Sequence, residues 1–340
     1  MKKLKIFDKF LFIINSLLAF ALLLSYLLPH IPPLNFPLLS VLSLGVPLLI
    51  LGNLIFMLFW AIRFKPQFLL SFIILVAGYN YVNAWFQVGN DTIESDNNLS
   101  IMSYNVRMFN AYKWVNDPLI PRKISSLVTE KDPDILVTQE HYVMESGIFK
   151  NYDHDYIKLK GKGSEFGMAI FSKYPIINRQ SLDFPENGNN NAIFVDIIKD
   201  RDTMRIFNVH FQSLNIKPGL QDIKDADSKQ LIGRIGFGFG LQQKQAEILK
   251  SAVENSPYKT LVLGDFNNTA FSYIYRYIKG DRFKDAFLHA GKGFGKTFSL
   301  NYFPLRIDFL FIDEPLQVNS FEVFRVNYSD HYPIMARLEW

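Results

Sequence analysis

The chain contains no cysteine, which excludes disulfide bonds, thiolate zinc sites and a cysteine nucleophile. It also lacks a strong charge imbalance, because the formal net charge is +4 over 340 residues. Residues 1–90 hold six basic side chains and one acidic side chain, which leaves a net charge of −1 on residues 91–340. The larger part of the chain therefore lacks the broad basic surface of a dedicated nucleic-acid-binding protein, which disfavours a nuclease without excluding one.

Charged residues are also missing from three long apolar stretches near the N-terminus, at about residues 10–28, 38–62 and 68–88. Each stretch is about long enough to cross a hydrocarbon core of about 30 Å. The sequence therefore predicts an anchor of residues 1–89 with three transmembrane helices. Two alternatives remain open: the first stretch as a cleaved signal peptide, and the third, which carries Gly78 and two asparagines, as an interfacial helix.

Short basic flanks predict the orientation of this anchor. Four lysines precede the first stretch, and Arg63 and Lys65 lie between the second and the third. The positive-inside rule makes both flanks cytoplasmic, so the chain from about residue 90 onward faces outward. We therefore expect a multi-pass cell-membrane protein with a cytoplasmic N-terminus, a polar linker at 90–98 and an extracytoplasmic domain at 99–340.

Strand-like and helix-like runs alternate after the linker, which favours an α/β fold. Nine strands exceed what one short sheet comfortably holds, so two packed mixed β-sheets flanked by helices fit better than a doubly wound fold. Helices are expected over 118–131 and 241–254. The strands are expected near residues 99–105, 134–140, 166–172, 191–198, 203–210, 259–264, 306–312, 318–325 and 333–339.

Residues 217–240 include a stretch in which glycine alternates with bulky apolar residues. The favoured interpretation is a surface loop. The alternative is a segment that touches the membrane or gates the substrate, because the domain is tethered beside lipid.

Four apolar runs end in polar side chains, the pattern of buried strands that deliver functional groups to one rim of a sheet. The polar residues are Asn105, Glu140, Asp265 with Asn267, and Asp330 with His331. Carboxylates, amides and imidazoles gathered at one rim make a metal-assisted hydrolase site. Taken singly, each has an ordinary explanation as a turn cap, a solvated acid, an Asx turn or a surface Asp-His turn.

Residue type predicts a role for several of these groups. Asn105 and Glu140 offer the hard oxygen ligands that Mg²⁺ or Mn²⁺ prefers. Asp265 can orient or deprotonate a water molecule, and Asn267 can hold that water or a phosphate oxygen. The alternative for this second pair is an Asx turn that follows the strand.

Two histidines complete the candidate set. His331 is suited to stabilising a charged phosphoryl oxygen if a carboxylate holds its second ring nitrogen, and Asp308 is the candidate partner. The alternative for Asp308 is a surface pair with Arg306. His210 ends its own apolar run, where it can protonate a leaving oxygen or polarise the phosphate; a lone histidine at this position would be structural.

Taken in order, these motifs resemble the endonuclease/exonuclease/phosphatase superfamily over about residues 98–340. The motifs are Ser103-Tyr-Asn-Val106, Gln139-Glu140, Val209-His210, Gly-Asp265-Phe-Asn267, Arg306-Ile-Asp308 and Ser-Asp330-His331. The resemblance implies a four-layer α/β sandwich that hydrolyses phosphoester bonds with magnesium. Members of the superfamily act on DNA, sphingomyelin and inositol phosphates.

The resemblance also implies roles residue by residue. Asn105 and Glu140 would bind the metal, with Asp330 in support. Asp265 would align or activate the attacking water, and Asn267 would contact that water and the phosphate.

The histidines follow the same resemblance. His331, oriented by Asp308, would stabilise the phosphoryl oxygens, and His210 would assist at the phosphate or the leaving group. His210 is similar to the histidine of secreted deoxyribonucleases and sphingomyelinases, whereas apurinic endonucleases generally have a tyrosine-containing segment there.

One position departs from the superfamily pattern. Some DNA-cleaving relatives place an acid shortly after the asparagine, whereas this chain has Asn105-Val-Arg107. Arg107 is a candidate for binding substrate phosphate, and its alternative is a surface or ion-paired arginine. Because this acid is missing, the sequence leaves the number of metal ions, one or two, open.

The sequence thus predicts a membrane-anchored phosphoric ester hydrolase that depends on Mg²⁺ or Mn²⁺ and uses in-line attack of water. A lipid headgroup or a small phosphoester is the favoured substrate, and extracytoplasmic cleavage of DNA or RNA is the alternative. A non-catalytic membrane-anchored binding protein on the same fold is a second alternative, disfavoured because every polar strand end is retained. The sequence does not predict protein partners.

Overall fold

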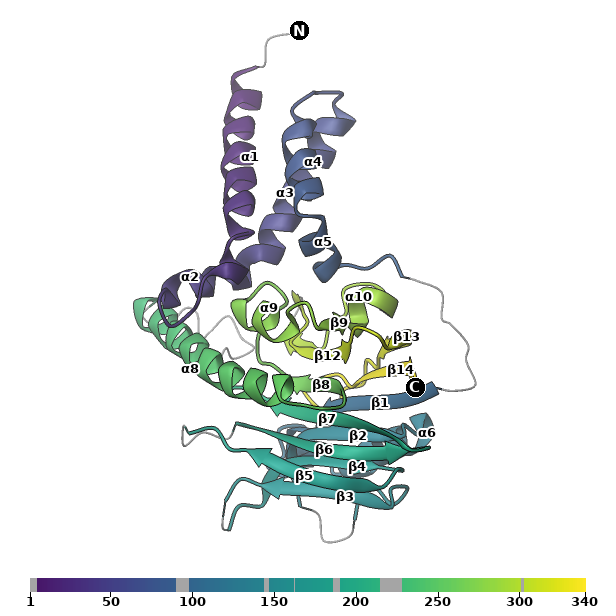
Figure 1. Cartoon of the computed structure of the whole chain (residues 1–340). Coiled ribbons are helices and arrows are strands. Elements are labelled where there is room, and N and C mark those ends of the chain that lie inside the picture. Colours follow the sequence, from purple (N-terminus) through teal and green to yellow (C-terminus); the bar gives the residue numbers. More distant parts are fainter. Residues whose placement is uncertain are drawn as a thin grey trace.

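A computed structural model of the chain describes residues 5–89, 98–143, 147–161, 163–185, 190–214, 228–300 and 303–340. Residues 5–89 form a helical bundle that stands on a two-sheet α/β domain (Figure 1). Nearly all of the predicted linker at 90–98, and residues 217–227 of the predicted loop, lie outside the described residues.

The bundle contains the first two predicted spans. Its elements are α1 (Ile6–Ser25), η1 (Leu28–His30), α2 (Pro37–Leu42), η2 (Ser43–Gly45), α3 (Val46–Ile62), α4 (Phe68–Ala77) and α5 (Tyr79–Trp85). Two helical stretches, Ile6–His30 and Pro37–Ile62, are long and apolar enough to cross a membrane.

The third predicted span, 68–88, is not one straight helix, because α4 and α5 meet at an angle of 81°. Gly78 lies at the bend, where a Cβ atom would sit 2.0 Å from the ring of Tyr26. The Tyr26 hydroxyl donates to the carbonyl of Ile74 over 2.9 Å. Close packing against Tyr26 therefore accounts for the glycine, and α5 leaves the bundle toward the α/β domain (Figure 1).

Buried polar side chains connect α1, α3 and α4. Asn15 Nδ2 donates to Ser71 Oγ over 2.6 Å, and Ser71 Oγ donates to Asn53 Oδ1 over 3.0 Å. Trp60 Nε1 donates to Asn15 Oδ1 over 3.0 Å, and all four side chains are fully buried. Polar groups inside an apolar bundle need such partners, so the network supports α4 as a third member of the bundle.

Two six-stranded sheets pack face to face in the α/β domain. The first has the order β13 (Gln317–Val323), β14 (Ile334–Glu339), β1 (Asn98–Asn105), β2 (Ile135–Tyr142), β4 (Phe166–Ser172) and β3 (His154–Leu159). The second has the order β5 (Ile176–Leu182), β6 (Asn191–Lys199), β7 (Asp202–His210), β8 (Lys259–Asp265), β12 (Asp308–Asp313) and β9 (Phe283–Asp285). The pairs β1–β2 and β7–β8 are parallel and the other pairs antiparallel, so both sheets are mixed.

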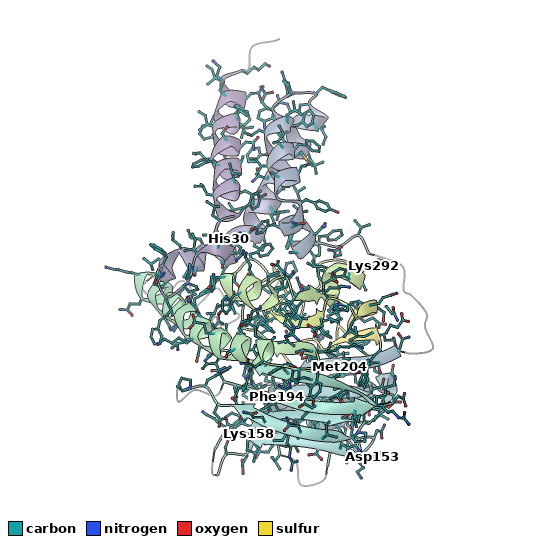
Figure 2. All side chains as sticks on the ribbon, in the orientation of Figure 1. His30, Asp153, Lys158, Phe194, Met204 and Lys292 are labelled. Atoms are coloured by element: carbon teal, nitrogen blue, oxygen red, sulfur yellow. The ribbon has the colours of Figure 1, made fainter. Side chains whose placement is uncertain are left out.

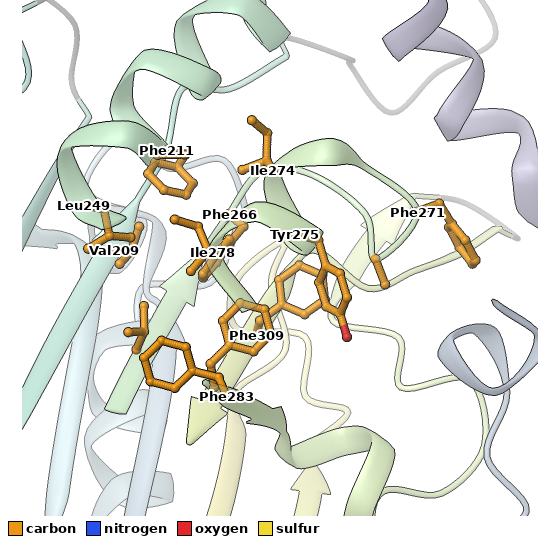
Figure 3. Close-up of a cluster of buried hydrophobic side chains, with 14 of the residues drawn as sticks. Val209, Phe211, Leu249, Phe266, Phe271, Ile274, Tyr275, Ile278, Phe283 and Phe309 are labelled. Carbon is orange, nitrogen blue, oxygen red and sulfur yellow. The ribbon is translucent and has the colours of Figure 1, made fainter. Parts of the chain in front are cut away.

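Helices cover the outer faces of the sheets, as the predicted four-layer α/β sandwich requires. Buried residues of α6 (Ile120–Lys131) pack against the first sheet. The second sheet packs against α8 (Ser228–Glu254) and α9 (Tyr273–Lys279), and Figure 3 shows this cluster. The remaining short elements are η3 (Arg107–Asn110), α10 (Ala286–Ala290), β10 (Phe298–Leu300) and β11 (Phe303–Leu305).

The prediction of a surface loop at 217–240 is wrong for residues 228–240, the part that the structure describes. These residues belong to α8, which is one continuous helix from Ser228 to Glu254. Its glycines allow α8 to approach the anchor. A Cβ atom at Gly236 would lie 3.2 Å from the carbonyl oxygen of Pro37. Gln243 Oε1 accepts a hydrogen bond from the backbone nitrogen of Leu34 over 2.9 Å. Gly236 thus marks close packing of α8 against the anchor rather than a loop.

The anchor and the α/β domain share one hydrophobic core. The rings of Tyr81 in α5 and Phe271 stack with centroids 6.4 Å apart. The backbone groups of Gln87 and Gly293 exchange two hydrogen bonds, of 2.9 and 2.8 Å. The anchor residues buried in the same cluster as the core of the second sheet are Leu22, Leu28, Val46, Ile50, Leu75 and Ala84.

Deletion of residues 1–89 should therefore destabilise the α/β domain. Phe271 and its neighbours would lose their apolar cover, and each large side chain newly exposed costs about 1.5–3 kcal/mol. We expect the chain that begins at residue 90 to show a lower Tm than the full chain in detergent, measured by circular dichroism. A protease site inserted within 90–97 is the control, because the cleaved halves should still co-purify. A monomeric 90–340 fragment with the Tm of the full chain would contradict the shared core.

Candidate active site

The strand register of the second sheet places three predicted site residues side by side at one end of adjacent strands. They are His210, Asp265 and Asp308. His210 pairs with Asp265 across the parallel strands β7 and β8, and Asp308 pairs with Asp265 across β8 and β12. From the other sheet, Asn105 at the end of β1 donates through Nδ2 to Asp265 Oδ2 over 3.0 Å. Asp265 thus lies at the centre of the cluster, in contact with residues of both sheets.

The chain around Asp265 depends on two unusual backbone positions. Gly264 has φ +138°, and a Cβ atom there would lie 2.1 Å from the carbonyl oxygen of Val209 on β7. Asn267 has φ 50°, and its backbone nitrogen donates to Asp265 Oδ1 over 2.8 Å. Asn267 therefore faces Asp265 through a turn. The Asx turn, given above as the alternative to a functional pair, is therefore what places Asn267 beside Asp265.

Glu140 reaches the cluster through a β-bulge. The sequence predicted that its strand ends here, but β2 continues to Tyr142 and its pairing shifts between Thr138 and His141. Glu140 itself has φ 49°, and its Oε1 lies 3.5 Å from Asn105 Nδ2. Its side chain is 28% exposed, whereas Asn105 is 1% exposed. Bulges re-aim side chains in this way, and here Glu140 forms the open side of the cluster.

Asp308 and His331 form the pair that the sequence predicted. His331 Nδ1 lies 3.0 Å from Asp308 Oδ2, and its Nε2 lies 3.6 Å from Asp265 Oδ2. The alternative pairing of Asp308 with Arg306 on the surface is wrong. Arg306 is buried and its Nη1 donates to Asp285 Oδ2 over 2.7 Å.

His210 lies between two carboxylates. Its Nε2 is 3.7 Å from Asp265 Oδ2 and 3.9 Å from Glu140 Oε1. The side chain is 7% exposed, so it is enclosed by the cluster rather than free at the surface. Its ring nitrogen therefore points at the same space as the two acids.

Arg107 and Asp330 lie at the partly exposed rim of the cluster. Arg107 Nε lies 3.3 Å from Asp330 Oδ2, with side chains 31% and 24% exposed. Ser329 Oγ donates to the carbonyl oxygen of Asn105 over 2.8 Å, which ties the Asp330 segment to the end of β1. Arg107 begins η3, in which all four residues have φ between 43° and 62°. A left-handed turn without glycine is strained, and such strain is often found at functional sites.

Burial is the largest influence on the pKa of two carboxylates of the cluster, Asp265 and Glu140. Burial raises the pKa of Asp265 to about 6, with His331 lowering it and Asp308 raising it by smaller amounts. Burial also raises the pKa of Glu140. Burial disfavours the ionised form of these acids, and a nearby cation would stabilise that form.

The two histidines differ in protonation state at neutral pH. Burial lowers the pKa of His210. Burial alone would also lower the pKa of His331, but the carboxylates of Asp308 and Asp265 outweigh it and raise the pKa to about 10. At neutral pH His331 is therefore a cation and His210 a neutral imidazole, a division of the kind that separates charge stabilisation from proton transfer.

The residue types of the cluster suit a divalent cation. Asn105 Nδ2 faces the Glu140 carboxylate over 3.5 Å, and Asn105 Oδ1 accepts a hydrogen bond from the backbone nitrogen of Arg107 over 3.1 Å. Rotation of the amide group would turn its oxygen toward Glu140, where Asp330 contributes negative charge. Oxygen donors of this kind suit Mg²⁺ and Mn²⁺. Asp265, Asp308 and His331 form a second group, whose ligand atoms lie within 4.8 Å of one another. That group includes an imidazole, which Mg²⁺ disfavours, so Asn105, Glu140 and Asp330 stay the predicted ligands for Mg²⁺.

Gln242 on α8 supports the site and was not predicted. Its Nε2 donates to the carbonyl oxygens of Gln212 over 2.7 Å and Asn267 over 3.2 Å. Its Oε1 accepts a hydrogen bond from Asn268 Nδ2 over 2.6 Å, and the side chain is fully buried. One glutamine thus holds the segments that follow β7 and β8. A glutamine near the start of a predicted helix gives no sequence signal for this role.

Replacement of Gln242 with alanine should lower kcat, because the segments carrying Asn267 and Gln212 lose a shared partner. Displacement of a catalytic group by about 1 Å costs up to about 100-fold in rate, and we expect a loss of that order. Gln243→Ala is the matched control, since Gln243 contacts Leu34 of the anchor instead. Steady-state kinetics on the full chain would separate the two. Equal losses of kcat in both variants would contradict a specific role for Gln242.

Comparison with known proteins locates two family matches along the chain. Residues 102–331 match the model described as the endonuclease/exonuclease/phosphatase family, and residues 8–85 match that of a domain of unknown function. No curated protein matches the chain.

Solved structures share the fold of the α/β domain. An endonuclease/exonuclease/phosphatase from Bacteroides vulgatus has a TM-score of 0.55 at 18% identity, over 71% of this chain and 98% of that one. Truncated Caenorhabditis elegans TDP2 gives 0.53 at 18% identity, over 72% and 98%. D. rerio TDP2 complexed with single-strand DNA product gives 0.54 at 14% identity, over 72% and 100%. At these identities the similarity shows the fold alone.

Proposed function

Because the chain belongs to the endonuclease/exonuclease/phosphatase family, we propose that it is a membrane-anchored, divalent-metal-dependent phosphoesterase. Members of this family are generally metal-dependent hydrolases. The observation that carries the proposal is the convergence of Asn105, Glu140, Asp265 and His331, which are far apart in sequence, on one cluster.

Asp265 is the proposed base for the attacking water. Asn267 holds one carboxylate oxygen of Asp265 through its backbone nitrogen, and the other oxygen faces Asn105 and both histidines. A carboxyl pKa near 6 leaves Asp265 ionised at neutral pH but basic enough to accept a proton. General-base catalysis of this kind typically contributes about 10²- to 10⁴-fold in rate.

The remaining residues act on the phosphate. The His331 imidazolium, oriented by Asp308, stabilises negative charge on the phosphoryl oxygens, and His210 assists at the leaving oxygen. Arg107 and Asn267 are the proposed contacts for substrate oxygens. A divalent cation held by Asn105 and Glu140, with Asp330 in support, would supply Lewis-acid polarisation of the phosphoryl group.

A phospholipid headgroup or small phosphoester is the proposed substrate, since the domain packs directly on helices apolar enough to span a membrane. A nuclease is the second candidate, because a structurally similar protein, D. rerio TDP2, was solved with single-strand DNA product. The net charge of −1 on residues 91–340 favours the first candidate over the second.

A substrate panel on the full chain tests the proposed activity. Phospholipid vesicles, DNA, RNA and bis(p-nitrophenyl) phosphate would each be incubated with Mg²⁺ or Mn²⁺, and with EDTA as the control. We expect metal-dependent hydrolysis that is faster on phospholipid than on nucleic acid. Cleavage of nucleic acid alone would favour the second candidate, and no metal-dependent product from any substrate would contradict a phosphoesterase.

We further infer that residues 1–89 anchor the protein with a cytoplasmic N-terminus and that the α/β domain is extracytoplasmic. The absence of cysteine makes this directly testable, because single cysteines can be introduced at Lys65 and Lys150. A membrane-impermeant maleimide should label Lys150→Cys in intact cells and Lys65→Cys only after permeabilisation. The reverse labelling pattern would contradict the proposed orientation.

A further inference from the structure

A cavity of about 530 Å³ separates part of the anchor from the α/β domain. Its walls are η1 and α5 on the anchor side and α9 and α10 on the domain side. His30, which lines it, is labelled at this junction in Figure 2. None of the lining residues belongs to the candidate active site. The cavity is therefore a separate feature that the proposed hydrolysis does not use.

The domain side of the cavity presents two cations from the last turn of α9, Arg276 and Lys279. Lys279 Nζ donates to the carbonyl oxygen of Gly280 over 3.0 Å. Within the described part of the chain, neither cation forms an ion pair with a carboxylate. Asp281 is the single acid of the lining, so the wall carries a net positive charge.

The anchor side presents groups that suit a phosphate ester. Asn80 and Asn83 of α5 line the cavity opposite the two cations and offer amide donors. Tyr81 between them is fixed, because its hydroxyl donates to the carbonyl oxygen of Tyr26 over 2.7 Å. Cationic and amide groups on facing walls can donate hydrogen bonds to the oxygens of a phosphate.

The depth of the cavity matches the headgroup region of a bilayer. α1 has 20 residues, a rise of about 30 Å, which is about the thickness of the hydrocarbon core. η1 follows at the end of α1, so His30 lies where the headgroups begin. Apolar residues exposed just before it, Leu23, Leu24 and Leu27, provide a surface for acyl chains. Tyr79 of α5 is 63% exposed, as expected of an interfacial aromatic residue.

We propose that this cavity binds the phosphate of an anionic phospholipid, with the acyl chains against α1 and the headgroup between Arg276, Lys279 and the amides of α5. The bound lipid bridges the anchor and the α/β domain and fixes their relative position. The inference rests on the proposed membrane insertion of the anchor and is independent of catalysis.

Thermal unfolding of the full chain in mild detergent tests the proposal. Short-chain phosphatidylglycerol, short-chain phosphatidylcholine and inorganic phosphate would be titrated separately, and Tm would be followed by intrinsic fluorescence. A ligand that binds only the folded state raises Tm, so phosphatidylglycerol should do so and the other two should not. Each basic side chain near an anionic membrane surface contributes about 1 kcal/mol, so Arg276→Gln with Lys279→Gln should weaken phosphatidylglycerol binding by roughly 30-fold.

Two further variants make the test specific. Lys244→Gln with Lys292→Gln removes the same charge outside the cavity and should leave the response to phosphatidylglycerol unchanged. Asn80→Trp keeps both cations, alters an exposed residue and should block the site. All variants should keep their hydrolysis of bis(p-nitrophenyl) phosphate, so a failure of this proposal is distinguishable from a failure of the proposed enzyme activity.

Three results would overturn the proposal. The first is an equal response to phosphatidylglycerol in the wild-type chain and the Arg276→Gln, Lys279→Gln variant. The second is an equal loss of response in the Lys244→Gln, Lys292→Gln control, which would indicate general electrostatic attraction. The third is a full response to inorganic phosphate, which would assign the cavity to a soluble anion rather than a lipid.

Discussion

Replacement of Asp265 with asparagine should lower kcat by roughly 10³-fold while the protein stays folded. The substitution keeps the shape of the side chain and removes the basic oxygen that Asn105 and both histidines surround. Burial raises the pKa of Asp265 to about 6, so the ionised carboxylate is less stable in the folded chain than in the unfolded one. Loss of this charge should therefore not lower Tm above that pH. Steady-state kinetics with bis(p-nitrophenyl) phosphate and thermal unfolding measure the two effects.

Asp285→Asn is the matched control for that substitution. Asp285 is a buried aspartate of the same sheet, and its carboxylate pairs with Arg306 and accepts from the Tyr275 hydroxyl over 2.7 Å. Removal of one partner of a buried ion pair costs about 3–5 kcal/mol, so Tm should fall while kcat of the folded enzyme is retained. A kcat for Asp265→Asn within tenfold of wild type would refute the proposed base.

Replacement of Glu140 with glutamine should weaken Mg²⁺ binding by about 100-fold or more. Changes to groups around a metal site that are not themselves ligands already cost about 10- to 100-fold in affinity, and Glu140 is the partly exposed carboxylate of the cluster. The Mg²⁺ concentration for half-maximal activity, together with isothermal titration, measures the effect.

Two comparison variants separate the possible metal sites. Glu165→Gln removes a surface acid near the same sheet and should leave Mg²⁺ affinity unchanged. Asp308→Asn should lower kcat through His331 without a comparable loss of Mg²⁺ affinity, because Asp308 is the imidazole partner. If Asp308→Asn weakens Mg²⁺ and Glu140→Gln does not, the ion sits in the group formed by Asp265, Asp308 and His331 instead.

The sequence predicted the ends of the strands that carry the candidate site well where those strands are buried and end in polar groups. β1, β7 and β8 end at Asn105, His210 and Asp265, close to the predicted ends. Buried strands have continuous apolar runs, which make their ends visible in sequence. β3 and β5 were missed because both are largely exposed and their side chains alternate with polar residues.

Other features depend on contacts that a sequence does not display. The bulge at Glu140 arises from the pairing of β2 with β4, and the bend at Gly78 arises from the ring of Tyr26. The glycine-containing start of α8 resembled a loop in sequence, and the contact that explains Gly236 is with Pro37, about two hundred residues away in sequence. In each case a tertiary contact overrode the local pattern.

The packing of the anchor changes how the protein should be handled. The sequence predicted a polar linker between the anchor and the outer domain, and in the structure Leu28 and Val46 of the anchor share a core with Phe271 of the domain. Gln243 of α8 contacts the anchor one residue away from Gln242, which holds the candidate active site. Experiments on catalysis should therefore use the full chain in detergent or lipid.

Anomalous X-ray scattering from crystals of the full chain grown with Mn²⁺ would show whether the distant strand ends converge on one cation. We expect one anomalous peak beside the Glu140 carboxylate and the Asn105 amide, on the Asp330 side of the cluster. A peak enclosed by Asp265, Asp308 and His331, or no peak at this edge of the two sheets, would contradict it.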